Sequence, residues 1–514
     1  MNLLKITYLI VTTFIFGLTL GAQELTIEDI SLAEDHIIDV ENGGFVVIRD
    51  IDPKKVRLGN YQAKHQFQLF NADLALVASD TVLLGGQIAD NPIQAAVFNG
   101  SHYLIAFKKK GGKLALRYYD EAGQLFRAVG CPCLETGEYI KAIPKGFVHF
   151  ESITKKEGLK MLMIGKNKGW INQFKPEKGR YLIRSYQQVN NLIALMLEKV
   201  GAVRTRKQQL ELIIIDAHRG TILSHTELGA TNKVIYPVKP LIDGQNVVLS
   251  GVYFEGKKLN YRQSSGLFLL KYATDGTLQT EQYEPWTRDY EDAIRRQTKR
   301  NQSGLKTSHL ITLPLALFKT NGGYQLAGEL YYNAINKKSL LSKGLKMSLS
   351  FSNKEGLSSE NSNLTAGDFI FFNFDGETTP LNNLFFHEKY HAPLGGIFSE
   401  ADGGANDDIF LKAMRTRMQP FDPMGADKPF LPLPTDDGNS FIFMDMEKDL
   451  DDGQVKQVTL TETGTEEAFT LDNKNLAGLV VGKKDVITYL PTTQGTIYEY
   501  QYNRKAKRMV IVKM

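Results

Sequence analysis

The strongest candidate for catalytic chemistry is the pentapeptide His387–His391, which reads His-Glu-Lys-Tyr-His. On a helix, two histidines four residues apart share a face and can both bind Zn²⁺, while the glutamate polarises a water. The preceding residues 381–386 look like a strand, and Pro393 disfavours helix just before it. On an extended strand His387 and His391 lie about 13 Å apart, too far to share one zinc ion. We therefore predict a strand and a loop here, with no metal site and no catalytic residue.

Three acidic segments form the next candidate site, because calcium binds six to eight oxygen ligands and Asp, Asn and Glu supply them. The segments are residues 400–408, 436–439 and 445–453, and each contains glycine. None has the ligand spacing of an EF-hand loop, and tight β-turns use the same residues for conformational reasons. We expect solvated turns and no cofactor, with calcium as the alternative.

A lysine-rich run and a cysteine pair are the remaining residues of chemical interest. Residues 108–113 read Lys-Lys-Lys-Gly-Gly-Lys, which is typical of a solvated hairpin tip; a patch for an acidic polysaccharide is the functional alternative. Cys131 and Cys133 are separated by one proline, so a bridge between them would be strained. Thioredoxin-type motifs have a wider spacing and zinc sites need four ligands. We expect two loop cysteines, free or linked.

These residues must be positioned by β-strands, because alternating β-branched and aromatic runs recur along residues 23–514 with very little helical periodicity. The recurring unit is a strand, a polar turn and a second strand, as in residues 114–126 and 267–278. Asp, Asn and Gly accept positive φ in tight turns, so each unit predicts a β-hairpin. The predicted hairpins are centred near positions 73, 121, 178, 219, 275, 375, 452 and 504.

Repeats of roughly 40–50 residues, each a small antiparallel sheet, are typical of β-propeller blades. On this pattern the chain resembles the exported bacterial β-propellers as an architectural class. The resemblance implies an all-β fold, a β-propeller of about 7–8 four-stranded blades. It implies no particular function, because the sequence has no recurring Trp-Asp dipeptide and only two tryptophans. Tandem β-sandwich domains, which also contain many short strands, are the alternative.

Two polar stretches interrupt the repeat. Residues 286–308 are rich in charge and could contain a short helix, and residues 342–367 are rich in Ser and Asn and have no apolar face to bury. We expect both to be insertions in one propeller domain spanning residues 23–514, and the second to be a poorly ordered loop.

The first residues predict export. Lys5 is followed by an uncharged run, residues 6–20, and then by Gly21 and Ala22. A positive start, a short apolar run and small residues form a secretory signal peptide, here residues 1–22. The apolar run is short for a membrane span, and no later run approaches that length. We expect a secreted or periplasmic protein without a transmembrane segment after signal removal.

Composition narrows the function without identifying it. The chain has 514 residues and a net charge of +4, too small for its overall charge to drive it onto nucleic acid or an anionic membrane. No Gly-x-Ser-x-Gly elbow locates a nucleophile, and no glycine-rich phosphate loop precedes a helix. We expect a non-catalytic protein that presents loops to a protein or glycan ligand, not to nucleic acid. The alternative is an extracytoplasmic hydrolase or lyase, acting on glycan or peptide at the propeller channel; the oligomeric state stays open.

Overall fold

The computed structural model covers most of the chain between Glu24 and Lys513. The residues that it describes are 24–50 apart from 31–34 and 42, 62–85, 93–131 apart from 109–113, 140–152 apart from 144–145, 159–174 apart from 165–168, 180–200, 208–301 apart from 230–231 and 257–263, 306–335 apart from 321, 364–374, 380–393 apart from 382–383 and 388–391, and 433–513 apart from 435–439, 447–451, 461–464, 475–485 and 492–496.

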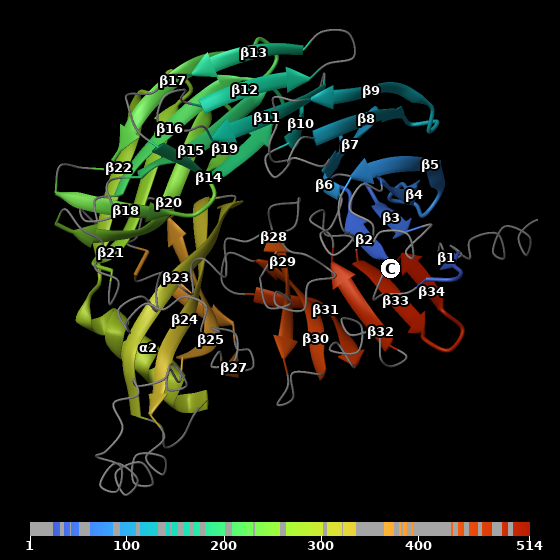
Figure 1. Ribbon diagram of the computed structural model, residues 1–514. Helices are drawn as coiled ribbons and strands as arrows, with labels where there is room; N and C mark the ends of the chain where they lie inside the picture. Colours follow the sequence, from blue (N-terminus) through green and yellow to red (C-terminus); the bar gives the residue numbers. More distant parts are fainter. Residues whose placement is uncertain are drawn as a thin grey trace, which may run out of the picture.

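The described strands form antiparallel units of about four strands, arranged as blades around a ring (Figure 1). Blade 1 consists of β2 (His36–Asp39), β3 (Phe45–Asp50), β4 (Gln62–Phe70) and β5 (Leu76–Gly85). Blade 2 consists of β6 (Ile93–Phe98), β7 (His102–Lys108), β8 (Leu114–Asp120) and β9 (Leu125–Cys131). Blade 3 consists of β10 (Ile140–Ile143), β11 (Gly146–Ser152), β12 (Leu159–Ile164) and β13 (Gly169–Phe174). Blade 4 consists of β14 (Arg180–Val189), β15 (Leu192–Val200), β16 (Gln208–Asp216) and β17 (Thr221–Leu228).

The second half of the ring repeats this arrangement with one helix added. Blade 5 contains β18 (Lys233–Pro237), β19 (Leu241–Asp243), β20 (Asn246–Glu255), β21 (Gly266–Ala273) and β22 (Leu278–Pro285), and is followed by α2 (Arg288–Asn301). Blade 6 contains β23 (Lys306–Thr320), β24 (Gly323–Ile335), β25 (Leu364–Phe374), β26 (Leu384–His387) and β27 (Ala392–Pro393). Blade 7 contains β28 (Leu433–Pro434), β29 (Ser440–Met446), β30 (Asp452–Leu460) and β31 (Thr465–Lys474), and blade 8 contains β32 (Val486–Pro491), β33 (Ile497–Asn503), β34 (Arg508–Lys513) and β1 (Glu24–Ile27).

The ring is closed by the two ends of the described chain. The N-terminal strand β1 pairs antiparallel with the C-terminal strand β34, with Glu24 opposite Val512 and Ile27 opposite Met509. Blades 7 and 8 are joined into one sheet where Lys474 of β31 pairs with Ile487 of β32. Blade 8 therefore takes its outermost strand from the opposite end of the chain, and the all-β propeller predicted from the repeats is confirmed.

Apolar side chains fill the interfaces between neighbouring blades. Ile143 and Val148 of blade 3 pack with Leu195 and Ile213 of blade 4, all of them buried. Equivalent clusters join blade 1 to 2, 2 to 3, 4 to 5, 5 to 6 and 8 to 1, and Val458 of blade 7 packs against blade 6. Burying each such side chain stabilises the fold by about 1.5–3 kcal/mol. Successive side chains of a strand point to opposite faces of the sheet. A blade can therefore bury one face against the preceding blade and the other face against the following blade.

The turn between the third and fourth strands has the same construction in several blades. Asn71 Oδ1 accepts a hydrogen bond of 2.9 Å from the Ala75 amide, and Asp120 Oδ1 accepts one of 2.8 Å from the Gln124 amide. Gly123 has a φ of 78°, and a Cβ there would lie 1.6 Å from the Val77 carbonyl oxygen of blade 1. The ladder shifts register beside this turn in blades 1, 2, 4 and 5, where an exposed aliphatic residue follows, namely Leu76, Leu125, Ile222 and Leu278.

Antiparallel topology gives the ring two unlike faces. The first-to-second and third-to-fourth strand connections emerge on one face and include the brief turns 99–101, 190–191 and 244–245. We call it the short-turn face. The second-to-third strand connections and the links between blades emerge on the opposite face and include 336–363 and 394–432. We call it the long-connection face.

Some boundaries differ from the sequence expectations. The hairpin predicted near 178 is wrong, because β13 and β14 belong to different sheets and residues 175–179 link two blades. The hairpin of blade 3 instead joins β12 to β13, where the polar segment 165–168 contains no Asp. The helix expected within 286–308 is confirmed as α2. Of the insertion predicted over 342–367, residues 342–363 lie outside the described residues, whereas residues 364–367 belong to β25, which pairs with β24.

Candidate functional site

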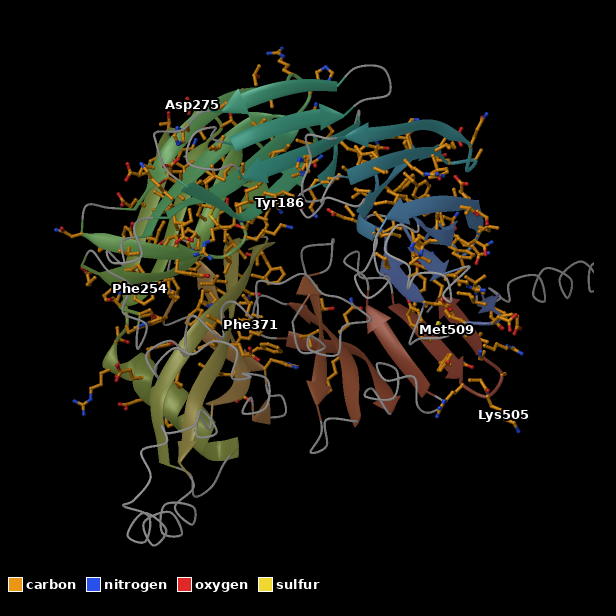
Figure 2. All side chains as sticks on the ribbon, in the orientation of Figure 1. Tyr186, Phe254, Asp275, Phe371, Lys505 and Met509 are labelled. Atoms are coloured by element: carbon orange, nitrogen blue, oxygen red, sulfur yellow. The ribbon has the colours of Figure 1, made fainter. Side chains whose placement is uncertain are left out.

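Polar side chains connect the inner strands of successive blades near the short-turn face. Glu41 follows β2, and its backbone pairs with that of Val97 on β6. Its carboxylate forms an ion pair with Lys141 on β10, and the Lys141 ammonium lies 5.2 Å from the ring centroid of Tyr186 on β14. Figure 2 shows Tyr186 on the inner side of the ring. Three side chains thus link blades 1 to 4.

The same series continues into blades 5 and 6. Gln187 Oε1 accepts a hydrogen bond from the Ile242 amide of β19. Asp243, at the end of β19, accepts hydrogen bonds of 2.6 Å from Lys319 Nζ and 2.8 Å from the Tyr324 hydroxyl, both in blade 6. We call this set the inner belt: Glu41, Lys141, Tyr186, Gln187, Asp243 and Lys319.

Charges in the inner belt compensate each other. The hydrogen bond from Lys319 lowers the pKa of Asp243, partial burial opposes this effect, and the Tyr324 hydrogen bond lowers that pKa further. Burial and the bond to Asp243 raise the pKa of Tyr324. At neutral pH the pair is therefore a carboxylate and a neutral phenol. The ionisable groups of the inner belt already bind one another. We therefore interpret the inner belt as a set of contacts that hold the blades in position.

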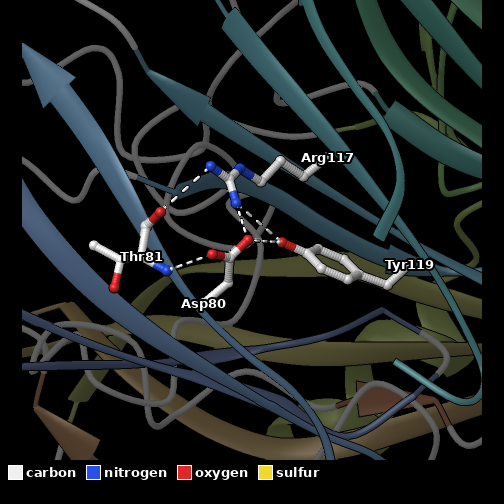
Figure 3. A network of polar contacts seen from close by, with 4 residues as sticks. All are labelled: Asp80, Thr81, Arg117 and Tyr119. Carbon is white, nitrogen blue, oxygen red and sulfur yellow. Dashed lines mark hydrogen bonds and ion pairs between the residues drawn. The ribbon is translucent and has the colours of Figure 1, made fainter. Parts of the chain in front are cut away.

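A second polar network joins the outer strands of blades 1 and 2 (Figure 3). The Arg117 guanidinium on β8 forms an ion pair with Asp80 on β5 and reaches the Thr81 carbonyl at 3.4 Å. The Tyr119 hydroxyl donates to Asp80 Oδ2 at 3.1 Å, and the Thr81 amide donates to Asp80 Oδ1 at 2.6 Å. Burial raises the pKa of Tyr119, which keeps the phenol protonated as a donor. This network fixes one blade against the next.

Two further ionisable pairs lie within blade 4. Arg184 on β14 forms an ion pair with Glu198 on β15, and burial raises the pKa of that carboxyl against the opposing effect of Arg184. Glu211 on β16 is buried, and its Oε2 lies 2.8 Å from Nε2 of His225 on β17. Both pairs join adjacent strands of a single sheet, so they support the blade itself.

Only the first residue of the histidine motif, His387, is described, and residues 388–391 lie outside the described residues. His387 is the last residue of β26, opposite Phe369 of β25, and the two rings are 6.5 Å apart. His391 lies outside the described residues, so the separation of the two histidines stays a prediction. Within the described ranges, no group of three His, Cys, Asp or Glu side chains is arranged to hold a metal ion.

The other predicted sites lie largely outside the described residues. Cys131 ends β9 and Lys108 ends β7, whereas Cys133 and residues 109–113 are not described. Of the acidic segments, only Asp445 on β29 and Asp452 on β30 with their strand neighbours are described, so calcium binding stays a prediction. The predicted signal peptide, residues 1–22, also lies outside the described residues and stays a prediction. No helix in the described ranges is long and apolar enough to span a membrane.

Helix α2, in the link between blades 5 and 6, is anchored to both of them. Thr287 Oγ1 caps its first turn by accepting a hydrogen bond of 3.2 Å from the Tyr290 amide. The Tyr290 ring stacks on Trp286 at 4.3 Å, and its hydroxyl lies 2.6 Å from Thr312 Oγ1 of blade 6. Tyr290 and Ile294, one turn apart, are buried between blades 5 and 6. Arg288, Asp289, Asp292 and Arg296 of the helix are exposed.

Comparisons with known proteins found distant structural likenesses. No protein-family model matches the chain, and a search of curated proteins gives no match. Among solved structures, the WD40 domain of SCAP from fission yeast is similar with a TM-score of 0.40 and 8% identity, over 96% of this chain and 98% of that one. Apo AztD from Citrobacter koseri gives 0.36 and 7%, over 89% and 97%.

A third similar structure is cobalt-substituted ACO from Synechocystis, with a TM-score of 0.28 and 13% identity. It covers 55% of this chain, which spans 66% of that protein's length. At these scores the likenesses carry no argument about activity or ligand, so the function must be argued from this chain's own residues.

Proposed function

We propose that the protein is an exported binding protein without catalytic activity, which presents its long-connection face to a component outside the cytoplasm. The observation that carries the proposal is the difference between the two faces. The short-turn face includes brief turns such as 99–101, 190–191 and 244–245. The opposite face carries α2 and the longest connections. Connections on a rigid β-scaffold are where binding residues concentrate.

The inner belt supports a non-catalytic role. A hydrolase needs a nucleophile or a general base free to meet a substrate. Here Glu41 and Asp243 each form an ion pair with a lysine of another blade. Their removal should loosen the ring rather than stop a reaction.

Export rests on the signal sequence, residues 1–22. Intact-mass measurement of the protein recovered outside the cytoplasm should place the first residue near Ala22 or Gln23. This start lies directly before β1, so cleavage leaves the closing strand complete. Recovery of soluble, exported protein that retains residues 1–20 would contradict export by cleavage.

The binding face is tested by site-specific photo-crosslinking in living cells. A photoreactive amino acid is placed at Ala506 or Asp289 on the long-connection face, and at Ser101 or Glu121 on the short-turn face as matched controls. All four positions are exposed. The proposal predicts that the first two positions give a shared crosslinked partner and that the controls do not.

Two results would overturn this function. The first is crosslinking of the same partner from both faces, or from Ser101 and Glu121 alone. The second is cleavage of envelope glycans or peptides by the purified protein, as a hydrolase or a lyase, when Glu41→Gln or Asp243→Asn abolishes the activity and leaves the protein folded. That result would establish the enzyme alternative.

A further inference from the structure

Four cations lie close together in one described turn of the long-connection face. This turn joins β33 to β34 in blade 8, and residues 504–508 read Arg-Lys-Ala-Lys-Arg. We call these five residues the basic turn. All five are exposed, and Figure 2 shows Lys505 at the outer margin of the ring. Such dense runs of Lys and Arg are typical of surfaces that bind polyanions, so the basic turn is a candidate ligand site.

The backbone of the basic turn is held in place. Asn503 Oδ1 accepts a hydrogen bond of 2.8 Å from the Ala506 amide. The Lys507 amide donates one of 3.2 Å to the Arg504 carbonyl. The Lys507 carbonyl accepts one of 2.8 Å from the amide of Ile30, a buried residue. A turn that is already ordered loses little conformational freedom when a ligand binds, which favours affinity.

The protein neutralises the charge of the basic turn only in part. Arg508 Nε lies 3.8 Å from Glu28 Oε1, and both side chains are exposed. Asp29, between Glu28 and the anchored Ile30, supplies a second exposed carboxylate. Lys505 and Lys507 form no ion pair with any residue in the part of the chain that the structure describes. Two ammonium groups are therefore available to an anionic ligand.

The neighbours of these cations restrict the class of ligand. Tyr502 and Met509, which flank the basic turn, are buried in the cluster that joins blades 8 and 1. The basic turn itself has no aromatic ring on which a nucleobase could stack. It also has no large apolar side chain to anchor a protein interface or to enter a lipid bilayer. Recognition by charge alone remains, and it fits a hydrophilic polymer.

The shape of the basic turn favours a thin polymer over a planar surface. A flat anionic membrane that approached the cations would also approach the carboxylates of Glu28 and Asp29, which lie beside them. A single polymer chain can follow the cations and leave these carboxylates in solvent. Ion pairs with the carboxylate or sulfate groups of such a chain need no further partner from the protein.

We propose that the basic turn binds an acidic polysaccharide, with Lys505 and Lys507 as its principal contacts. The proposal rests on the binding role of the long-connection face and names the chemical class of its partner. Binding of a polyanion releases condensed counterions, so affinity falls steeply as salt rises. With three to four contacts, an increase from about 50 to about 200 mM salt should weaken binding at least about tenfold.

Binding of the full mature chain to immobilised dextran sulfate tests the proposal, with dextran of equal length as the uncharged control. The turn variant carries Lys505→Ser and Lys507→Asn, because asparagine tolerates the φ of 51° at position 507. The control variant carries Arg219→Gln and Lys513→Gln, which remove two cations from the short-turn face.

We expect the wild type to bind dextran sulfate and not dextran. At low salt the turn variant should bind at least about tenfold more weakly, and the control variant should stay within about twofold of the wild type. The slope of log affinity against log salt should become shallower by about 0.7 for each lysine removed. Equal thermal unfolding midpoints show that folding does not cause the difference. Lys505→Glu alone should also weaken binding, which keeps the test decisive if the change at position 507 disturbs the turn.

Three results would overturn the proposal: no binding of the wild type to dextran sulfate at low salt, full binding by the turn variant, or an equal loss in the control variant. Binding to phosphatidylglycerol vesicles without binding to dextran sulfate would assign the turn to a membrane and overturn it as well. The crosslinking result separates this proposal from the binding role itself. Crosslinks confined to Ala506 and Asp289 keep that role even if dextran sulfate does not bind, whereas crosslinks from both faces remove it whatever dextran sulfate shows.

Discussion

Tyr119 donates a hydrogen bond of 3.1 Å to Asp80, and the carboxylate oxygen that accepts it is also paired with Arg117 (Figure 3). Tyr119 and Arg117 stand two residues apart on β8, so both side chains leave the same face of blade 2 towards β5 of blade 1. One aspartate thereby holds two donors of the next blade. Contacts of this kind, repeated in the inner belt, fix the relative position of neighbouring blades.

The first prediction concerns this contact. Tyr119→Phe removes one donor but leaves Asp80 paired with Arg117, so the free energy of unfolding should fall by about 1 kcal/mol. Urea unfolding measures the change. Tyr103→Phe is the control, since Tyr103 is also buried and stacks on Phe98 but makes no such bond to Asp80. Equal destabilisation by both changes would contradict the role of the Tyr119 hydroxyl.

Alkaline pH should weaken the fold through buried tyrosines. Burial raises the pKa of Tyr236 from 10.0 to about 12, with Arg184 opposing and Glu198 adding to the shift. A group whose folded pKa is raised contributes its full stability below the unfolded pKa, and loses it as pH rises through the folded value. Stability should therefore fall between pH 10 and about pH 12.

Tyr236→Phe tests this assignment. The phenylalanine variant should lose about 2 kcal/mol less than the wild type over that pH window, because it has one fewer phenol to ionise. Unfolding by urea at successive pH values gives the two curves. Parallel curves would show that Tyr236 does not contribute to the alkaline loss.

Ring closure by β1 gives a third prediction. Ile27 is buried with Tyr500 and Ile511 in the cluster that joins blades 8 and 1. Ile27→Ala should lower the free energy of unfolding by about 2–4 kcal/mol, whereas Thr26→Ala at the neighbouring exposed position should change it by less than about 0.5 kcal/mol. Equal effects of the two substitutions in thermal or urea unfolding would show that β1 is not packed as described.

The histidine motif supplies the fourth prediction. Because His387 ends a strand, we expect His387→Ala with His391→Ala to leave the bound-metal content of the purified protein unchanged. Elemental analysis of wild type and variant measures it. Stoichiometric zinc in the wild type that disappears in the double variant would favour the enzyme alternative.

The repeat pattern predicts the blades well because the sequence signals for strands and turns lie in neighbouring residues. Hairpins such as the one at Asp120–Gln124 combine a turn residue with alternating neighbours, and both signals are local. The hairpin prediction is wrong at one position where the turn signal is weaker. Lys-Pro-Glu-Lys-Gly at 175–179 resembles a hairpin but links two sheets, since sheet membership depends on packing that no local signal encodes.

The inner belt could not be predicted from local sequence. Glu41 and Lys141 meet because strands of three blades converge, and neither residue stands in a motif.

Lysine acetylation footprinting tests most directly the central claim that the long-connection face is the face that meets a partner. The protein is acetylated once in its native surroundings and once after purification, and the reactivity of each lysine is compared between the two samples. The account predicts that Lys505 and Lys507 react more slowly in the native surroundings, while Lys319 and Lys513, which pair with Asp243 and Asp73 at the short-turn face, react equally in both samples. Protection of Lys319 and Lys513 instead, or equal reactivity of all four lysines in both samples, would contradict it.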